Sequence, residues 1–204
     1  MISLDCEKLT GEYEEAKELG IKTKPVVIGP YTMLKLCRYV GSKNAEDFAD
    51  DVAEAYRQLI AECDEANVEW LQFDEPSLVR DMDDDDKALF HRVYDRVFAD
   101  RADCKILLQT YFGDVRDVYE DIINMPFAGI GLDFIEGKQT GQLIDRYGFP
   151  GDKVLFAGLV NGKNIWRNHY DKTLRIIRQL RDKKTDVVLS TSCSLLHVPY
   201  TLKH

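Results

Sequence analysis

The stretch Glu69-Trp70-Leu71-Gln72-Phe73-Asp74-Glu75-Pro76 decides the fold of this 204-residue chain. Its apolar run, Trp70 to Phe73, predicts a buried strand that ends on two adjacent carboxylates and is stopped by a proline. Packing alone does not require acids at the tip of a strand. Barrel enzymes place their chemistry at the carboxyl end of each strand, so Asp74 and Glu75 stand where functional residues are expected.

Five more apolar runs end in polar or reactive residues in the same way, and the first of them ends in a Gly-Pro turn. Patterns of apolar residues with helical spacing separate the runs. This alternation predicts right-handed βαβ crossovers and a parallel sheet. Six strands fall short of the eight in a closed barrel, so the pattern leaves open a doubly wound sheet or a barrel without two of its units. The predicted strands besides 70–73 are 24–29, 105–111, 129–135, 154–160 and 187–193, and the predicted helices are 10–20, 44–66, 89–97, 114–124, 138–147 and 170–180.

Composition narrows the class of protein. The chain is long enough for one sizeable domain, and its net charge of −9 argues against nucleic-acid binding. No apolar run approaches the roughly 18–20 residues of a membrane span, and the N-terminus does not read as a secretory signal. The five cysteines are scattered and include no Cys-x-x-Cys pair. They predict reduced thiols and a cytoplasmic location rather than a disulfide framework or a zinc ribbon.

A run of four acids, Asp83 to Asp86, precedes one of the helical patterns. The run does not have the glycine and the distal glutamate of a calcium loop. We therefore expect it to begin a helix, where the helix dipole favours negative charge.

Four segments follow one another along the chain and carry a family resemblance. Together they resemble the cobalamin-independent methionine synthase family, and more narrowly its N-terminal half. The resemblance implies a parallel (β/α) barrel of the TIM type that is incomplete, with about six of eight strand–helix units, in which residues 1–204 form one domain. The segments are Lys24-Pro25-Val26-Val27-Ile28-Gly29-Pro30-Tyr31-Thr32, Trp70-Leu71-Gln72-Phe73-Asp74-Glu75-Pro76-Ser77-Leu78, Gly158-Leu159-Val160-Asn161-Gly162-Lys163-Asn164-Ile165-Trp166-Arg167 and Ser192-Cys193-Ser194-Leu195-Leu196-His197-Val198-Pro199.

The family resemblance also implies an activity. Members transfer a methyl group from 5-methyltetrahydropteroyltriglutamate, a folate, to homocysteine in methionine biosynthesis, using zinc held by a C-terminal barrel. On this mapping the chain is the non-catalytic, folate-side N-terminal barrel, inactive alone and partnered by the C-terminal catalytic barrel. The family's basic segment, a plausible partner for the polyglutamate tail, falls outside the chain.

Two other functions stay open. The chain could be a stand-alone binding or interaction module derived from that barrel, dimerising through its open sheet edges. It could also resemble a porphyrin-acid decarboxylase, but such a pocket needs several arginines at strand ends and only Arg167 lies near one.

No metal site and no catalytic residue are expected in this chain. In the family's catalytic barrel, the zinc ligands are a His and a Cys after strand five, a Glu after strand six and a Cys after strand eight. The corresponding positions here carry Gln109-Thr110-Tyr111, Asp133 with Glu136, and Cys193. One thiol and one carboxylate do not hold zinc well, so Cys193 is expected to be a small, part-buried thiol.

The strand ends and the resemblance together suggest a set of substrate-binding residues. The acids among them could instead accept backbone hydrogen bonds and fix loops, because a buried carboxylate needs partners. Lys163 and Arg167 suit an anionic folate tail, whereas the alternative for their neighbours is that Asn161 or Asn164 caps the next helix and Trp166 packs the rim. His197 is expected to anchor a loop. The suggested residues are Asp74, Glu75, Tyr111, Asp133, Asn161, Lys163, Asn164, Arg167 and Cys193.

Overall fold

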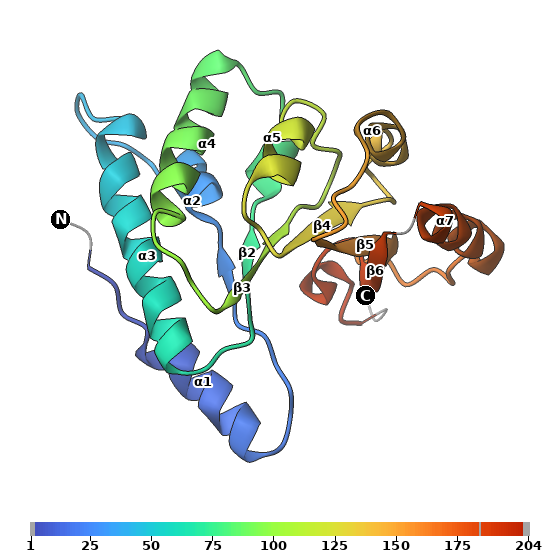
Figure 1. Cartoon of the computed structure of the whole chain (residues 1–204), viewed down its shortest axis with the longest axis horizontal. Coiled ribbons are helices and arrows are strands. Elements are labelled where there is room, and N and C mark those ends of the chain that lie inside the picture. The colour runs from blue at the N-terminus through green and yellow to red at the C-terminus, as the bar shows by residue number, and fades with distance from the viewer. Residues whose placement is uncertain (1–2, 184, 202–204) are drawn as a thin grey trace. The chain divides into compact units, whose positions relative to one another are not determined.

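The computed structural model describes residues 3–183 and 185–201, and its six strands follow one another in the sheet in chain order (Figure 1). The pairs β1–β2, β4–β5 and β5–β6 are parallel. Helices alternate with the strands, so the predicted parallel α/β architecture is confirmed. The strands are β1 (Val26–Ile28), β2 (Trp70–Asp74), β3 (Lys105–Gln109), β4 (Gly129–Asp133), β5 (Val154–Val160) and β6 (Asp186–Thr191).

The chain forms two compact units. Unit 1 comprises Met1–Ser77 and Met82–Leu108, and unit 2 comprises Leu78–Asp81 and Gln109–His204. The helices of unit 1 are α1 (Glu7–Glu18), α2 (Pro30–Leu36), α3 (Ala49–Glu65) and α4 (Asp84–Val97), and those of unit 2 are α5 (Tyr119–Asn124), α6 (Thr140–Tyr147) and α7 (Tyr170–Asp182).

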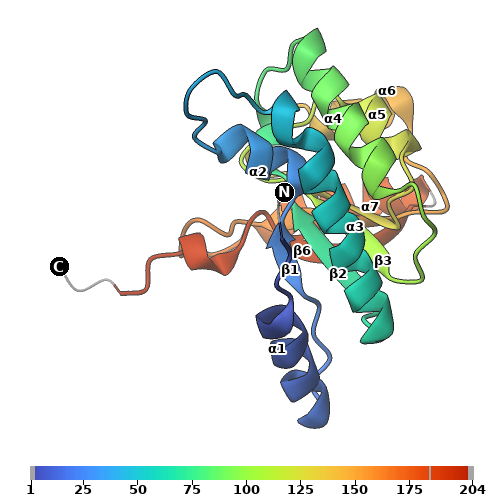
Figure 2. The same ribbon diagram turned by 90° about the vertical axis from the view of Figure 1, so that its left-hand side faces the viewer.

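The core of unit 1 forms where α3 and α4, which run side by side, bury their apolar faces (Figure 2). Apolar residues three and four positions apart lie on one side of each helix, as the sequence predicts. Strand β2 alternates between buried and partly exposed side chains, and Leu71 and Phe73 are buried completely. The buried helical residues include Val52, Tyr56, Leu59, Ile60 and Cys63 on α3 and Leu89, Phe90, Val93, Tyr94 and Val97 on α4.

The predicted Gly-Pro turn is wrong, because Gly29 and Pro30 begin helix α2. Gly29 has the extended backbone of an N-cap, and Pro30 occupies the first turn, where its missing N–H costs nothing. A short helix of seven residues gives too little periodicity to be recognised between a strand and a loop.

Two helix starts test the expectations about capping. Asp83 is the N-cap of α4 and its side chain accepts a hydrogen bond from the backbone N–H of Asp86, which confirms that the acidic run begins a helix. The helix predicted to begin at Asn44 begins instead at Ala49, after a 3-10 turn over Glu46–Phe48. Asn44 and Asp47 exchange side-chain hydrogen bonds with each other's backbone N–H, and this local turn delays the helix.

Unit 2 is best packed at β4, whose five residues are all buried. The strands predicted over 105–111 and 129–135 end earlier, at Gln109 and Asp133, and the helix predicted over 114–124 begins only at Tyr119. Asp133, the last residue of β4, accepts hydrogen bonds from the backbone N–H groups of Phe112, Ile135 and Glu136 in the adjoining loops.

Helix α7 is only partly covered. Leu180 is the only α7 residue that is buried, whereas Tyr170 is 59% and Leu174 46% exposed. The outermost strands are also incompletely covered: Val26 and Ile28 on β1 and Val188 and Leu189 on β6 are all at least 40% exposed. Helical spacing identifies an apolar face but does not supply the element that covers it. None of the helices within residues 3–183 and 185–201 has the length and apolar composition of a membrane span.

Candidate functional site

Glu75, directly after β2, is fully buried and is surrounded by hydrogen-bond donors. Its Oε1 accepts from the backbone N–H of Tyr31 at 2.9 Å and from the Tyr94 hydroxyl at 2.7 Å, and its Oε2 accepts from the N–H of Thr32 at 2.7 Å. The two N–H groups belong to the first turn of α2, where a carboxylate is favourable. Burial nevertheless raises the Glu75 pKa to about 7, since desolvation outweighs these hydrogen bonds. The contacts favour the structural alternative, in which Glu75 holds α2 and α4 to the end of β2.

Asp74 lies in a different environment from its neighbour. It is partly exposed, and its Oδ1 accepts a hydrogen bond from Gln72 Nε2 at 2.7 Å. Gln72 in turn accepts from Lys24 Nζ at 2.5 Å. Burial lowers the pKa of Lys24, and the charge of Asp74 partly opposes that shift. Residues two apart on a strand share a face, so Gln72 and Asp74 form a polar row on β2, on the side opposite Glu75.

In unit 2, Asp133 performs the same structural task as Glu75. Its Oδ1 accepts from the N–H groups of Ile135 at 2.7 Å and Glu136 at 2.9 Å, and its Oδ2 from the N–H of Phe112 at 3.0 Å. Burial is the main cause that raises the Asp133 pKa. Phe112 has a φ of 75°, a left-handed conformation that is strained for a bulky side chain. Asp133 therefore fixes the loops after β3 and β4 and helps to hold this strain.

Lys163 joins the same loops. Its Nζ lies 2.8 Å from Glu136 Oε1 and 4.9 Å from the centre of the Phe112 ring. The hydrogen bond that Lys163 donates to Glu136 is the first cause that raises the Lys163 pKa. The His197 ring lies 5.0 Å from Phe112 and 6.4 Å from Tyr111, so His197 is placed as the loop contact that the sequence predicts. Any anion at Lys163 would have to compete with Glu136.

Cys193 is buried, with 4% of its surface exposed. A Cβ on Gly162 would come within 2.5 Å of the Cys193 carbonyl oxygen and 2.9 Å of its Sγ. Burial is the main cause that raises the pKa of the thiol. The thiol is thus less reactive than a free cysteine, in agreement with the expected packing role.

The asparagines after β5 make turns rather than helix caps. Asn161 Oδ1 accepts from the N–H of Lys163 at 2.8 Å, and Asn164 Oδ1 accepts from the N–H of Trp166 at 3.0 Å. The capping alternative is wrong, since the N-cap of α7 is His169, which makes no side-chain cap. Trp166 is 79% exposed, so it does not pack the rim either. Side-chain bonds two residues ahead compete with capping in such polar loops.

The two cations suggested for an anionic ligand, Lys163 and Arg167, do not line the same cavity. Arg167, Asn161 and Asn164 line a cavity of about 310 Å³ between the loops after β4 and β5 and the start of α7, whereas Lys163 does not line it. Sequence reasoning missed other residues of this cavity, including Lys172 and His169. The signal was present, because residues 163–183 contain seven Lys or Arg and only two Asp in a chain of net charge −9.

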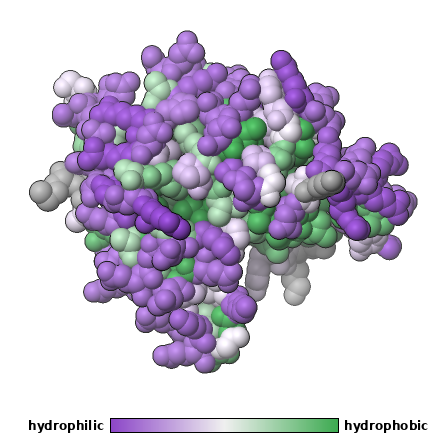
Figure 3. All heavy atoms as spheres, viewed as in Figure 1, coloured by the Kyte–Doolittle hydropathy of each residue, from purple (hydrophilic) through white to green (hydrophobic). Residues whose placement is uncertain are grey.

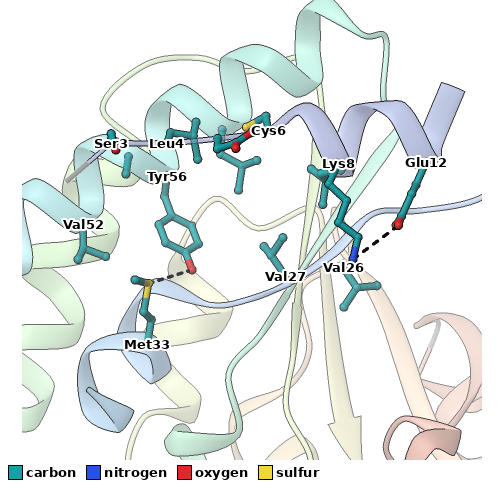
Figure 4. Close-up of a pocket in the computed structure, with 14 residues that line it drawn as sticks. Ser3, Leu4, Cys6, Lys8, Glu12, Val26, Val27, Met33, Val52 and Tyr56 are labelled. Atoms are coloured by element: carbon teal, nitrogen blue, oxygen red, sulfur yellow. Dashed lines mark hydrogen bonds and ion pairs between the residues drawn. The ribbon is translucent and has the colours of Figure 1, made fainter. Parts of the chain in front are cut away.

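Unit 1 holds a second cavity of about 460 Å³, which the sequence did not predict (Figure 4). Apolar side chains from β1 and α3 line it together with the segment that leads into α1. The Tyr56 hydroxyl lies 3.8 Å from Met33 Sδ at its edge, and Lys8 and Glu12 form an ion pair at 3.8 Å. Its described lining also includes the polar side chains of Asp5, Cys6, Lys8 and Glu12.

Within residues 3–183 and 185–201, no group of three or more His, Cys, Asp or Glu side chains is arranged to hold a metal ion. A zinc centre needs three protein ligands, and the donor set found here does not fit one.

Comparison with known proteins gives one consistent family. A model of the "cobalamin-independent synthase, N-terminal domain" matches residues 1–185. A 5-methyltetrahydropteroyltriglutamate–homocysteine methyltransferase from Streptococcus thermophilus is 50% identical over 98% of the chain, and one from Lactococcus lactis subsp. lactis is 50% identical over all of it. The chain spans about a quarter of each of these relatives, 26% and 27% of their length.

Solved structures show a similar fold. A Listeria monocytogenes chain assigned as a vitamin-B12 independent methionine synthase superposes with a TM-score of 0.73 at 20% identity, covering 95% of this chain and 65% of that one. A B12-independent methionine synthase from a Shewanella species, in complex with selenomethionine, gives 0.70 at 15% identity, with coverages of 98% and 62%.

Proposed function

Because the chain belongs to the family of cobalamin-independent synthase N-terminal domains, we propose that it is part of a 5-methyltetrahydropteroyltriglutamate–homocysteine methyltransferase. In this role, residues 1–204 form one domain, a portion of the N-terminal barrel. The observation that carries the proposal is 50% identity along nearly the whole chain to methyltransferases about four times as long.

The chain's part in the reaction is to support the folate side rather than to perform the transfer. Transfer to a thiol needs a thiolate, which zinc supplies by lowering the thiol pKa. The described residues do not fit a zinc centre, so the zinc and the homocysteine would be held by a C-terminal catalytic barrel of the same enzyme.

The side chains suggested at the strand ends then have distinct roles. Glu75, Asp133 and Cys193 are buried and hold loops and helices in place. Asp74 and Tyr111 are partly exposed and are the better candidates to contact a polar ligand. Asn161, Asn164 and Arg167 form a separate group, because they line the cavity beside α7.

A complementation experiment tests the proposal. The chain is produced together with the remainder of the Streptococcus thermophilus relative, and methyl transfer from 5-methyltetrahydropteroyltriglutamate to homocysteine is measured. Transfer is expected only when both polypeptides are present. The control is the relative's remainder alone. Activity of this chain alone, or no gain on mixing although both polypeptides are folded, would contradict the proposal.

A second function is favoured by the outer strands. Val26 and Ile28 on β1, and Val188 and Leu189 on β6, expose apolar surface at strands that end the sheet order. Such edges attract other chains, so a stand-alone interaction module that dimerises is the alternative. Light scattering separates the two, because a monomer at micromolar concentration argues against this module.

A further inference from the structure

The cavity beside α7, named here the α7 pocket, combines an apolar floor with a polar rim. Phe134, Leu159 and Ile176 supply apolar surface, and Asn164, Arg167 and Lys172 supply polar groups. Its volume of about 310 Å³ lies at the lower end for sites that take small organic molecules. A ligand that fits must therefore be small and must have both an apolar part and a polar part.

The charged side chains at the rim of the pocket favour a ligand of negative charge. Among the described residues, Arg167 and Lys172 form no ion pair, and Arg167 contacts the Tyr170 ring at 5.7 Å. By contrast, Lys163 pairs with Glu136 and Lys183 with Asp145, and neither lysine lines the pocket. Arg167 and Lys172 line the same cavity without an ion pair to any described residue, and two cations placed together in this way favour an anion there.

The start of α7 adds to this preference. The 13-residue helix begins at Tyr170, and its N-cap, His169, lines the pocket but makes no side-chain cap. The first N–H groups of a helix attract negative charge when no cap satisfies them. Asp171, the acid of the first turn, is not among the residues that line the pocket. In Figure 3 the surface over α7, at the right of the view, is mostly hydrophilic.

We infer that the α7 pocket binds a small organic carboxylate, with its acid group between Arg167 and Lys172 and its apolar part on the floor formed by Phe134, Leu159 and Ile176. The guanidinium of Arg167 would recognise the carboxylate through charge-assisted hydrogen bonds. The apolar floor distinguishes such a ligand from inorganic phosphate, which would gain nothing from it. The site concerns unit 2 alone and does not depend on methyl transfer.

Trp166 provides a direct readout, because it lines the pocket and is largely exposed. The experiment uses a Trp70→Phe variant of the 204-residue chain, in which Trp166 is the only tryptophan. Far-UV circular dichroism verifies that the variant is folded. The fluorescence of Trp166 is followed as benzoate is added. Two controls are titrated in the same way: benzamide, which has the same ring but no charge, and inorganic phosphate, which has the charge but no apolar part. Saturable quenching by benzoate, with at least about tenfold weaker responses to the other two, is the expected result.

Variants locate the binding. Arg167→Gln and Lys172→Gln are each expected to weaken benzoate binding about tenfold or more, because each removes a charge-assisted contact. Arg175→Gln is the matched control, since Arg175 is an exposed cation on α7 that does not line the pocket. The inference is overturned if benzoate gives no saturable signal, if benzamide or phosphate binds equally well, or if Arg175→Gln weakens binding as much as the pocket variants.

Discussion

Replacing Glu75 by glutamine should change how the stability of the protein depends on pH. The side chain is fully buried among the Tyr31 and Thr32 N–H groups and the Tyr94 hydroxyl, and burial raises its pKa from 4.5 to about 7. Between these two pH values the folded protein retains a proton that the unfolded chain has released. The stabilisation from this group is therefore fully present below pH 4.5 and is lost as the pH rises through 7.

The expected magnitude follows from the size of the shift. About two pH units separate pH 5 from the folded pKa, and one unit corresponds to about 1.4 kcal/mol. The free energy of unfolding should therefore fall by on the order of 2–3 kcal/mol between pH 5 and pH 8 because of Glu75 alone. The hydroxyls nearest to it do not contribute, since burial raises the pKa of both Tyr56 and Tyr94 above the ordinary 10.

Urea unfolding at several pH values, followed by circular dichroism, measures the effect. The glutamine of Glu75→Gln is neutral at every pH, so the free energy of unfolding of this variant should not show the decrease that Glu75 causes between pH 5 and pH 8. All other groups titrate in both proteins, so the difference between the two curves reports Glu75 alone. Glu14→Gln, at an exposed position on α1, is the matched control and should keep the wild-type slope. Parallel curves for the wild type and Glu75→Gln would refute the reasoning, because Glu75 would then titrate alike in the folded and unfolded states.

Gly162→Ala should lower the midpoint of thermal unfolding strongly, because the added Cβ would lie 2.5 Å from a backbone oxygen, whereas Gly141→Ala, with open space around it, should raise the stability by about 0.5 kcal/mol. Lys153→Met should cost roughly 2–4 kcal/mol in urea unfolding, since it removes two hydrogen bonds, of 2.7 and 3.1 Å, from the buried ammonium to carbonyl oxygens; a cost below about 1 kcal/mol would contradict this. Iodoacetamide followed by mass spectrometry should label exposed Cys37 well before buried Cys193, and equal rates would argue against the packing assigned to Cys193.

Much of the fold could be predicted from local pattern. The alternation of apolar runs and helical spacing gave the parallel α/β architecture, and the apolar positions of α3 and α4 are buried as expected. The acidic run at Asp83 identified a helix start, because capping depends on residues only three positions apart. Helix α2 was missed, since seven residues between a strand and a loop carry too weak a period.

The candidate site could be predicted only in part. The sequence identified the polar residues at the strand ends, but it did not separate Lys163, which pairs with Glu136, from Arg167, which lines the α7 pocket. It also could not assign Lys172 to the same pocket as Asn161. These assignments depend on which loop turns toward which helix, and the spacing of residues along the chain does not contain that information.

The sequence by itself determined the six strands, all the longer helices and which of their faces are apolar, because these features depend on neighbours within a few residues. The tertiary structure alone decided what those faces and charges meet. Glu75 became a buried anchor through donors on α2 and α4, located 44, 43 and 19 residues away along the chain. The apolar side of α7 stayed partly exposed despite its helical pattern, with Tyr170 and Leu174 open to solvent. The physical reason is that burial and hydrogen bonding are properties of pairs of groups, and most of those pairs are distant in sequence.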